Sequence, residues 1–320
     1  MRVLFARERF APGLEWSAYA PLLPGWELTS CAPTVIPGHL EGVDVLCSVG
    51  ARVDAGVIDR GTFGLVQQIG VGLDGIDVDA ATAAGVWVAR LPADLTGNAD
   101  SVGEHAVLLL LAVLRQLDQS RAVLRSGAWG APAGRSLARR TVVVLGLGAI
   151  GSAVVERLAG FGCHLIGVRA HPDRGGPETL DRVVGNEELD ALLPDADALI
   201  CCALYEPGMP PLVDRHVLSR LKPGAVLVNL ARGGLVDEDA VLESLNEDRL
   251  AGVGLDVLAT EPPAMTHPLL AHPRAVVTPH VAGVTDRTFH GAGELFAREL
   301  TRWAAGERPT FAVNVPPHPR

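Results

Sequence analysis

The chain has 320 residues, enough for two domains of ordinary size that each bury a core. Hydrophobic residues make up 48% of it, which argues against a disordered chain. Its 37 acidic against 27 basic residues give a net charge of −10, and the basic residues form no run longer than pairs such as Arg139-Arg140, so no nucleic-acid or anionic-membrane partner is expected.

The cysteines are odd in number and show no C-x-x-C spacing, so neither a disulfide framework nor a zinc site is predicted, and no metal is expected. We expect these five to be reduced and mostly buried: Cys31, Cys47, Cys163, Cys201 and Cys202. The first ten residues carry charges and lack the apolar core of a secretory signal. The longest apolar run, 106–114, has nine residues, whereas a membrane span needs about 20. We therefore expect a cytoplasmic protein.

The first part of the chain alternates short apolar runs with turns or short helical stretches. The runs lie at 2–6, 26–30, 43–49, 65–70 and 86–89. This pattern predicts a parallel sheet with crossover helices.

A glycine pair lies in IGVGLDGID (69–77), directly after the fourth run. It lacks a third glycine at the offset of a dinucleotide site, and Asp74 and Asp77 follow it, which would repel a pyrophosphate. We expect the N–H groups of this turn to face a smaller anion, such as a carboxylate.

Residues 98–129 lack turn signals for most of their length. Ser101 and Glu104, three residues apart, form a capping box that predicts a helix starting at Ser101. The segment is either a buried helix that links two domains or an oligomer contact, and the pattern leaves both open.

A second series of apolar runs follows, at 141–148, 164–168, 198–204, 225–231, 252–257 and 275–280, and predicts a second α/β domain.

Its first run ends in G-x-G-x-x-G, formed by Gly146, Gly148 and Gly151. Glycine serves a tight turn, a close approach of backbone to pyrophosphate and helix–strand packing. With Ala149 and Ile150 between them, these glycines predict a dinucleotide site at a helix N-terminus. A methyl-donor-binding fold is the alternative.

Arg169 stands about 20 residues beyond the glycines, where a carboxylate would bind the adenosine ribose. A guanidinium cannot accept hydrogen bonds from ribose hydroxyls, but it matches a 2′-phosphate. His171 and Arg174 lie close in sequence and add positive charge. Arg169 therefore favours NADP(H) over NAD(H), unless it is a solvated surface residue or only stacks on adenine.

Three ionisable residues follow late strands of the second series: Arg232, Glu261 and His280. The carboxyl ends of parallel strands collect at one edge, where ligands bind. Reduction of a keto acid needs a fixed cation for carboxylate and carbonyl, a proton donor and a group that orients the donor. Arg232, His280 and Glu261 match these roles in that order.

Each of these residues also has a structural alternative. Arg232 could pair with Asp237 or Glu238, Glu261 could be solvated, and His280 could be a buried core histidine. Asp256 is either a further site residue that contacts the cofactor amide or a helix cap. Residues 284–309 predict a final helix with an apolar face that includes Leu295, Leu300 and Trp303. This face must pack on another part of the chain, and the first domain is a candidate.

These segments together resemble the D-isomer-specific 2-hydroxyacid dehydrogenase family. The similar blocks are SVGEHAVLLLLAVLR (101–115), VVVLGLGAIG (142–151), residues 221–242, GLDVLATEPP (254–263), TPHVAGVT (278–285) and, in the first domain, residues 69–89. The resemblance implies two Rossmann-like or flavodoxin-like parallel-sheet domains with a cleft between them. Residues 1–95 and 287–320 would form a substrate-binding domain, and 96–286 a dinucleotide-binding Rossmann domain.

The resemblance also implies roles for individual residues. His280 would be the acid/base, Glu261 its partner, and Arg232 the ligand of substrate carboxylate and carbonyl. Backbone groups of Val71 and Gly72 would hold the carboxylate, and Ala231 and Asp256 would join the cofactor contacts. A small 2-keto or 2-hydroxy acid would be the substrate, and homodimers would form near residues 98–129.

Two departures from the family pattern stand out: Arg169, where many relatives have aspartate, and Leu204-Tyr205, where a proline and an apolar residue are expected beside the nicotinamide. Oxidation of formate or phosphite on the same scaffold is an alternative, although the 69–77 turn has no lysine to favour an inorganic anion. A cofactor-sensing protein, like the C-terminal-binding-protein corepressors, is another. No added C-terminal regulatory domain is expected.

Overall fold

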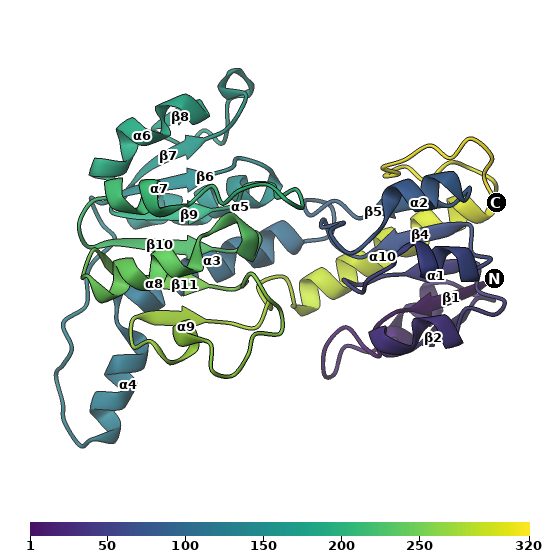
Figure 1. Cartoon of the computed structure of the whole chain (residues 1–320), viewed down its shortest axis with the longest axis horizontal. Helices are drawn as coiled ribbons and strands as arrows, with labels where there is room; N and C mark the ends of the chain where they lie inside the picture. Colours follow the sequence, from purple (N-terminus) through teal and green to yellow (C-terminus); the bar gives the residue numbers. More distant parts are fainter. The chain divides into compact units, whose positions relative to one another are not determined.

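The structure, a computed structural model, describes residues 1–320. The chain divides into two compact units, one of Met1–Asn98 with Val284–Arg320 and one of Ala99–Gly283. We call them unit 1 and unit 2; the colours of Figure 1 show that both ends of the chain belong to unit 1. Each unit is built on one parallel sheet, which confirms the expected α/β class with two parallel sheets. None of the helices combines the length and apolarity that crossing a membrane requires.

Unit 1 has a five-stranded sheet in the order β2-β1-β3-β4-β5, the flavodoxin-like order. Its strands are β1 (Arg2–Phe5), β2 (Glu27–Ser30), β3 (Val45–Cys47), β4 (Leu65–Gln68) and β5 (Trp87–Arg90). Its helices are η1 (Trp16–Leu22), η2 (Pro33–Gly38), α1 (Ala55–Arg60), α2 (Val78–Ala83) and α10 (Asp286–Ala304).

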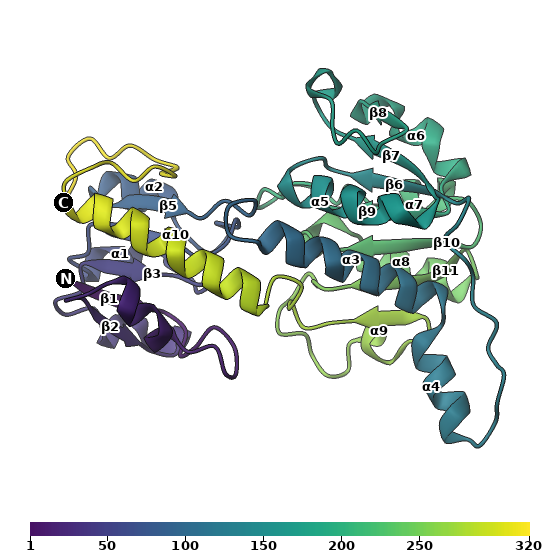
Figure 2. The ribbon, with the colours of Figure 1, turned by 180° about the vertical axis from the view of Figure 1, so that it is seen from behind.

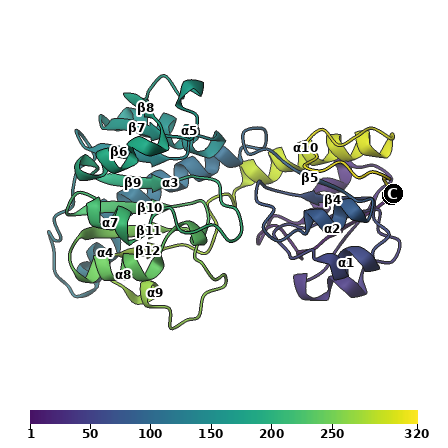
Figure 3. The ribbon, with the colours of Figure 1, turned by 45° about the horizontal axis from the view of Figure 1, so that its top comes forward.

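The final helix completes the core of unit 1. Leu295 and Leu300 of α10 are buried in the same core cluster as Phe5, and the hydroxyl of Tyr19 donates to the carbonyl of Phe289 at 2.7 Å. Figure 3 shows α10 on one side of the sheet and α1 and α2 on the other. The expected packing of the last helix on the first domain is therefore confirmed.

Unit 2 has a seven-stranded sheet in the order β12-β11-β10-β9-β6-β7-β8. Its strands are β6 (Thr141–Leu145), β7 (His164–Val168), β8 (Arg182–Val184), β9 (Ala198–Cys201), β10 (Ala225–Asn229), β11 (Leu250–Leu255) and β12 (Ala275–Val277). Its α-helices are α3 (Asn98–Leu114), α4 (Leu117–Arg125), α5 (Ala149–Leu158), α6 (Leu189–Leu192), α7 (Arg215–Arg220), α8 (Glu238–Asn246) and α9 (Pro268–Ala271).

Short 3-10 helices complete the connections of unit 2: η3 (Ala159–Phe161), η4 (Pro172–Arg174), η5 (Asn186–Glu188), η6 (Leu193–Asp195) and η7 (Gly233–Leu235). Helices α3 and α5 cover one face of the sheet, as Figure 2 shows, and α7 and α8 cover the other. The strand order changes direction between β6 and β9, and at such a point an open α/β sheet binds ligands.

The long helix after unit 1 differs from the expectation in two ways. It begins at Asn98 and not at Ser101, which lies inside α3 with its side chain buried, 4% exposed. It also ends at Leu114, because Gln116 adopts a left-handed conformation (φ +50) that separates α3 from α4. Each predicted apolar run corresponds to a strand, whereas β8, three residues long, was missed.

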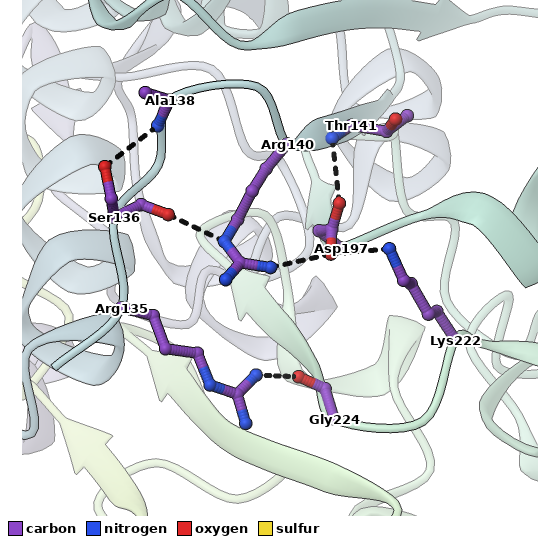
Figure 4. Close-up of polar contacts among 8 residues, drawn as sticks. All are labelled: Arg135, Ser136, Ala138, Arg140, Thr141, Asp197, Lys222 and Gly224. Carbon is purple, nitrogen blue, oxygen red and sulfur yellow. Dashed lines mark hydrogen bonds and ion pairs between the residues drawn. The ribbon is translucent and has the colours of Figure 1, made fainter. Parts of the chain in front are cut away.

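The amino ends of the central strands of unit 2 are joined by a polar cluster (Figure 4). The Asp197 carboxylate, before β9, accepts from Arg140 at 2.8 Å, from Lys222 at 2.9 Å and from the N–H of Thr141 at 3.1 Å. Burial acts to raise the pKa of Asp197, but these hydrogen bonds outweigh it and hold the pKa below its ordinary value. One arginine of the Arg139-Arg140 pair is thus engaged in a structural ion pair.

Candidate functional site

The glycine turn follows β6 at the point where the strand order changes direction. Gly146 has φ +98, and a Cβ on it would lie 2.6 Å from the backbone nitrogen of Ala203, after β9. A Cβ on Gly151 would lie 1.9 Å from the carbonyl oxygen of Gly146, so α5 packs against the turn with no room for a side chain. A Cβ on Gly148, by contrast, would meet nothing within 4 Å.

These three environments match the three uses of glycine in a dinucleotide site: the tight turn, the helix packing and an open approach to backbone. Helix α5 begins at Ala149, so the N–H groups of Ala149, Ile150 and Gly151 belong to its first turn and have no partner within the helix. The chain's own residues therefore fit a pyrophosphate at this turn.

Arg169 lies at the carboxyl end of β7, the strand after the glycine turn. Its guanidinium donates to the carbonyl of Gly175 at 2.5 Å, and its side chain is half-buried. Gly175 has φ +63, which lets residues 170–175 fold back over the strand end. This contact holds the arginine side chain at the carboxyl end of β7, while His171 and Arg174 are exposed beyond it.

Glu261 and His280 lie on the loops that follow β11 and β12. The Nδ1 of His280 is 2.7 Å from Oε2 of Glu261, and the side chains are 50% and 36% exposed. The other carboxylate oxygen of Glu261 accepts from the N–H of Leu258 at 3.0 Å. Because Nδ1 is engaged, Nε2 is the ring nitrogen left to exchange a proton with a ligand.

The loop of His280 is fixed by Asp256, which is buried and caps no helix. Its carboxylate accepts from the hydroxyl of Thr278 at 2.6 Å and from the N–H groups of Val281 and Ala282 at 2.9 Å each. His105 of α3 contacts the same hydroxyl at 2.9 Å. The alternative of a helix cap was therefore wrong, and Thr278 and His105 are contacts that the strand-end pattern missed.

Arg232 lies on the loop that follows β10, between β9 and β11 in the sheet. A Cβ on Gly233 would lie 1.9 Å from the carbonyl carbon of Leu258, so the Arg232 loop packs directly against the loop that carries Glu261. Asn229, buried at the end of β10, shapes this turn: its amide donates to the carbonyl of Arg232 at 2.9 Å and accepts from the N–H of Ala231 at 3.1 Å.

The electrostatics of Glu261 reflect these neighbours. Burial acts to raise its pKa, but the hydrogen bond and charge of His280, the N–H of Leu258 and the charge of Arg232 outweigh it, so the pKa lies below its ordinary value. The Glu261 carboxylate and the His280 imidazole are therefore in contact, and the Arg232 guanidinium acts on the same carboxylate through its charge, at the carboxyl edge of the sheet that also carries the glycine turn.

The acids that were alternative partners of Arg232 have contacts of their own. Asp237 caps α8, accepting from the N–H of Ala240 at 3.0 Å. Glu238 accepts from the N–H of Ala259 at 2.7 Å and contacts His267 at 3.1 Å.

Leu204 and Tyr205, the departure from the family pattern, follow β9 at the same edge. Leu204 is 78% exposed. The ring of Tyr205 packs on Gly234, where a Cβ would lie 2.8 Å from it. Tyr205 therefore packs against the loop that carries Arg232.

Val71 and Gly72 belong to unit 1, in the turn after β4. Gly70 has φ +120, and the N–H groups of Val71 and Gly72 donate to no acceptor in the structure. Asp77, which follows, caps α2 through the N–H of Ala80 at 2.9 Å.

The chain shows clear similarity to known proteins. Residues 107–282 match the model of the D-isomer specific 2-hydroxyacid dehydrogenase, NAD binding domain. The D-3-phosphoglycerate dehydrogenase of Mycobacterium leprae (strain TN) is 39% identical over 255 residues, which cover 78% of this chain and 47% of that protein. The chain thus spans about half the length of several curated relatives that it matches.

Two solved structures are similar over nearly the whole chain. An NADPH-dependent glyoxylate/hydroxypyruvate reductase from Sinorhizobium meliloti is 29% identical with a TM-score of 0.81, covering 100% of this chain and 99% of that one. An NAD-dependent formate dehydrogenase from Staphylococcus aureus is 26% identical with a TM-score of 0.82, covering 98% and 99%. With the extent of the family match and the identity to the mycobacterial protein, these similarities show that the chain belongs to the D-isomer specific 2-hydroxyacid dehydrogenase family.

Proposed function

We propose that the chain is an NAD(P)-dependent D-2-hydroxyacid dehydrogenase that reduces a small 2-keto acid or oxidises the corresponding 2-hydroxy acid. The observation that carries this proposal is the contact of 2.7 Å between His280 and Glu261, with the charge of Arg232 beside it, on the same sheet edge as the glycine turn. Family membership supports it, as does the similarity to the glyoxylate/hydroxypyruvate reductase from Sinorhizobium meliloti.

The proposed chemistry assigns one task to each residue. A bound nicotinamide cofactor would supply the hydride to the 2-keto carbon. The Arg232 guanidinium binds the substrate carboxylate and polarises the carbonyl. His280 donates the proton on Nε2 to the carbonyl oxygen, and Glu261 accepts the Nδ1 hydrogen bond and keeps the ring oriented. In the oxidative direction the neutral imidazole accepts the hydroxyl proton.

The remaining contacts are proposed for the other ligand groups. Gly146, Gly148, Ala149, Ile150 and Gly151 would hold the pyrophosphate, with Ala231 and Asp256 near the nicotinamide. Val71 and Gly72 would bind the substrate carboxylate through their N–H groups. Arg169 supports NADP(H) over NAD(H), because it follows β7, where the sequence pattern expects the ribose contact, and a guanidinium matches a 2′-phosphate.

A homodimer is proposed through residues near 98–129. Helix α4 buries none of its side chains within the chain, and Leu124 and Trp129 are 59% and 88% exposed. A second copy that covers this segment would bury apolar surface that a monomer leaves in water.

The test is an assay of glyoxylate, hydroxypyruvate, pyruvate and phenylpyruvate with NADPH and with NADH. We expect turnover with at least one keto acid and a higher kcat/KM with NADPH. His280→Ala should lower kcat by about 10²–10⁴-fold without weakening cofactor binding. His164→Ala, at a histidine 67% exposed on unit 2, is the matched control and should leave the rate unchanged.

Three outcomes would count against parts of the proposal. Tight cofactor binding with no turnover of any keto acid would favour a sensing protein. A His280→Ala variant that loses cofactor binding but keeps normal turnover at saturation would contradict the acid/base role. A clear preference for NADH would show that Arg169 does not select a 2′-phosphate.

A further inference from the structure

Three polar residues end neighbouring strands of the unit 1 sheet in register. Gln68 at the end of β4 is paired with Arg90 at the end of β5, and Ser48 follows Cys47 of β3, which is paired with Gln67. Partners in parallel strands point to the same face, so Ser48, Gln68 and Arg90 form one row at the carboxyl edge. The preceding row on this face is apolar, Leu46, Val66 and Val88, and fully buried.

Ser48 and Gln68 hydrogen-bond to each other. The buried hydroxyl of Ser48 donates to the amide oxygen of Gln68 at 2.5 Å, and the N–H of Gly50 donates to the same oxygen at 3.2 Å. These contacts hold the loop after β3, where Val49 adopts φ +44, an unfavourable conformation for a β-branched residue. Strain of this kind persists where the surroundings fix the backbone, and it clusters at ligand sites.

Arg90 has a different partner. Its half-buried guanidinium donates to the carbonyl oxygen of Val71 at 3.2 Å, and this is its one side-chain contact in the structure. The carbonyl of Val71 and the N–H of Gly72 are two ends of the same amide group. A cation that hydrogen-bonds to the carbonyl fixes the plane of that amide and polarises it, which strengthens its N–H as a donor.

The strengthened donor faces no acceptor within the chain. The N–H groups of Val71, Gly72 and Leu73 donate to no protein atom.

We propose that Arg90 is a positioning residue for substrate recognition, which holds and polarises the Val71–Gly72 amide so that the turn binds the carboxylate of a 2-keto acid. This rests on the proposed function and deepens it. Arg90 touches neither the reacting carbon nor the cofactor in this proposal, so it acts on substrate binding and not on the chemical step.

The test compares Arg90→Gln and Arg90→Lys with Arg60→Gln, a matched loss of charge at an exposed arginine on α1 of the same unit. Arg90→Gln should raise KM for the best keto acid about 10–100-fold, with kcat and cofactor affinity nearly unchanged, because the turn loses a charge-assisted hydrogen bond. Arg90→Lys should recover part of the loss, and Arg60→Gln should behave as wild type.

A neutral substrate separates positioning from general structure. The methyl ester of the same keto acid has no carboxylate, so Arg90→Gln should not change kcat/KM for the ester. An equal loss for acid and ester, or no loss for the acid, would overturn the proposal.

Oxalate, titrated calorimetrically into the folded proteins, tests the turn without any turnover. The wild type should bind oxalate and Arg90→Gln should bind it at least about tenfold more weakly. If the wild type reduces no keto acid but still binds oxalate more tightly than Arg90→Gln does, the anion site is supported and the proposed reaction is contradicted. Equal oxalate affinity in the two proteins would overturn the role of Arg90.

Discussion

His280 is held in a conformation that its residue type rarely adopts. Its φ of +54 lies in the left-handed region, which carries a cost for residues other than glycine. Its N–H donates to the carbonyl of Asp256 at 2.8 Å, and the Asp256 carboxylate holds the next two N–H groups. The buried acid thus fixes the backbone so that the ring meets Glu261.

The lowered pKa of Glu261 leads to a pH prediction. A carboxyl group whose folded-state pKa is depressed keeps its interaction above its unfolded-state pKa, about 4.3, and loses it as the pH falls through the folded value. The contact with His280 should therefore persist down to about pH 4.3 and fail in the acid range below it.

Initial rates of keto-acid reduction across the acid range check this prediction. The wild type should show an acid limb below about pH 4.3, and Glu261→Gln should lack that limb and be about tenfold or more slower throughout. Glu243→Gln, at an exposed acid of α8 in the same unit, is the control and should keep the wild-type profile. An acid limb that survives in Glu261→Gln would assign it to another group.

At the scale of elements, the glycine turn allows two substitutions of the same size to be compared. Gly151→Ala places a Cβ 1.9 Å from the Gly146 carbonyl oxygen, so α5 must move away from the turn. We expect a loss of about 1–3 kcal/mol in the free energy of unfolding, measured by urea denaturation.

Gly148→Ala adds its Cβ into open space with an ordinary backbone conformation (φ −84). Its stability should match that of the wild type, while dinucleotide affinity, measured by calorimetry, should fall at least about tenfold because the methyl group separates backbone from pyrophosphate. Unchanged affinity in a stable Gly148→Ala protein would contradict the proposed pyrophosphate site.

Most elements followed from local pattern, and the exceptions have physical causes. Apolar runs of four to eight residues marked strands, but β8 (Arg182–Val184) was missed because it contains only two consecutive apolar residues, Val183 and Val184. Ser101 and Glu104 satisfied a capping pattern, yet the chain is already helical from Asn98, and Ser101 lies buried within α3. In a protein, the packing of an apolar helix face stabilises a helix more than a local capping pattern does, so the capping pattern did not set the start of α3.

At the scale of the whole molecule, the apolar surface on α4 and beyond it concerns assembly. In Figures 1 and 2, α4 and the loop after it extend away from the sheet of unit 2. Leu124→Glu with Trp129→Ser should convert the proposed dimer into a monomer in sedimentation velocity, because both substitutions remove apolar surface that the second copy would cover.

The control for assembly is Leu204→Ser, at an exposed leucine in unit 2 outside the 98–129 segment, which should leave the sedimentation coefficient unchanged. A wild-type protein that sediments as a monomer at micromolar concentration, or a dimer that survives the double substitution, would contradict the proposed interface.

The sequence alone determined the α/β class, the two parallel sheets and the glycine turn, because strand length, hydrophobic period and glycine spacing are local properties of a chain. It also placed Arg232, Glu261 and His280 at strand ends. Only the tertiary structure decided that Nδ1 of His280 meets Glu261, that Asp256 holds the loop and that Arg90 reaches the carbonyl of Val71. Such contacts join residues far apart in the chain, and the packing of strands and loops sets their distances.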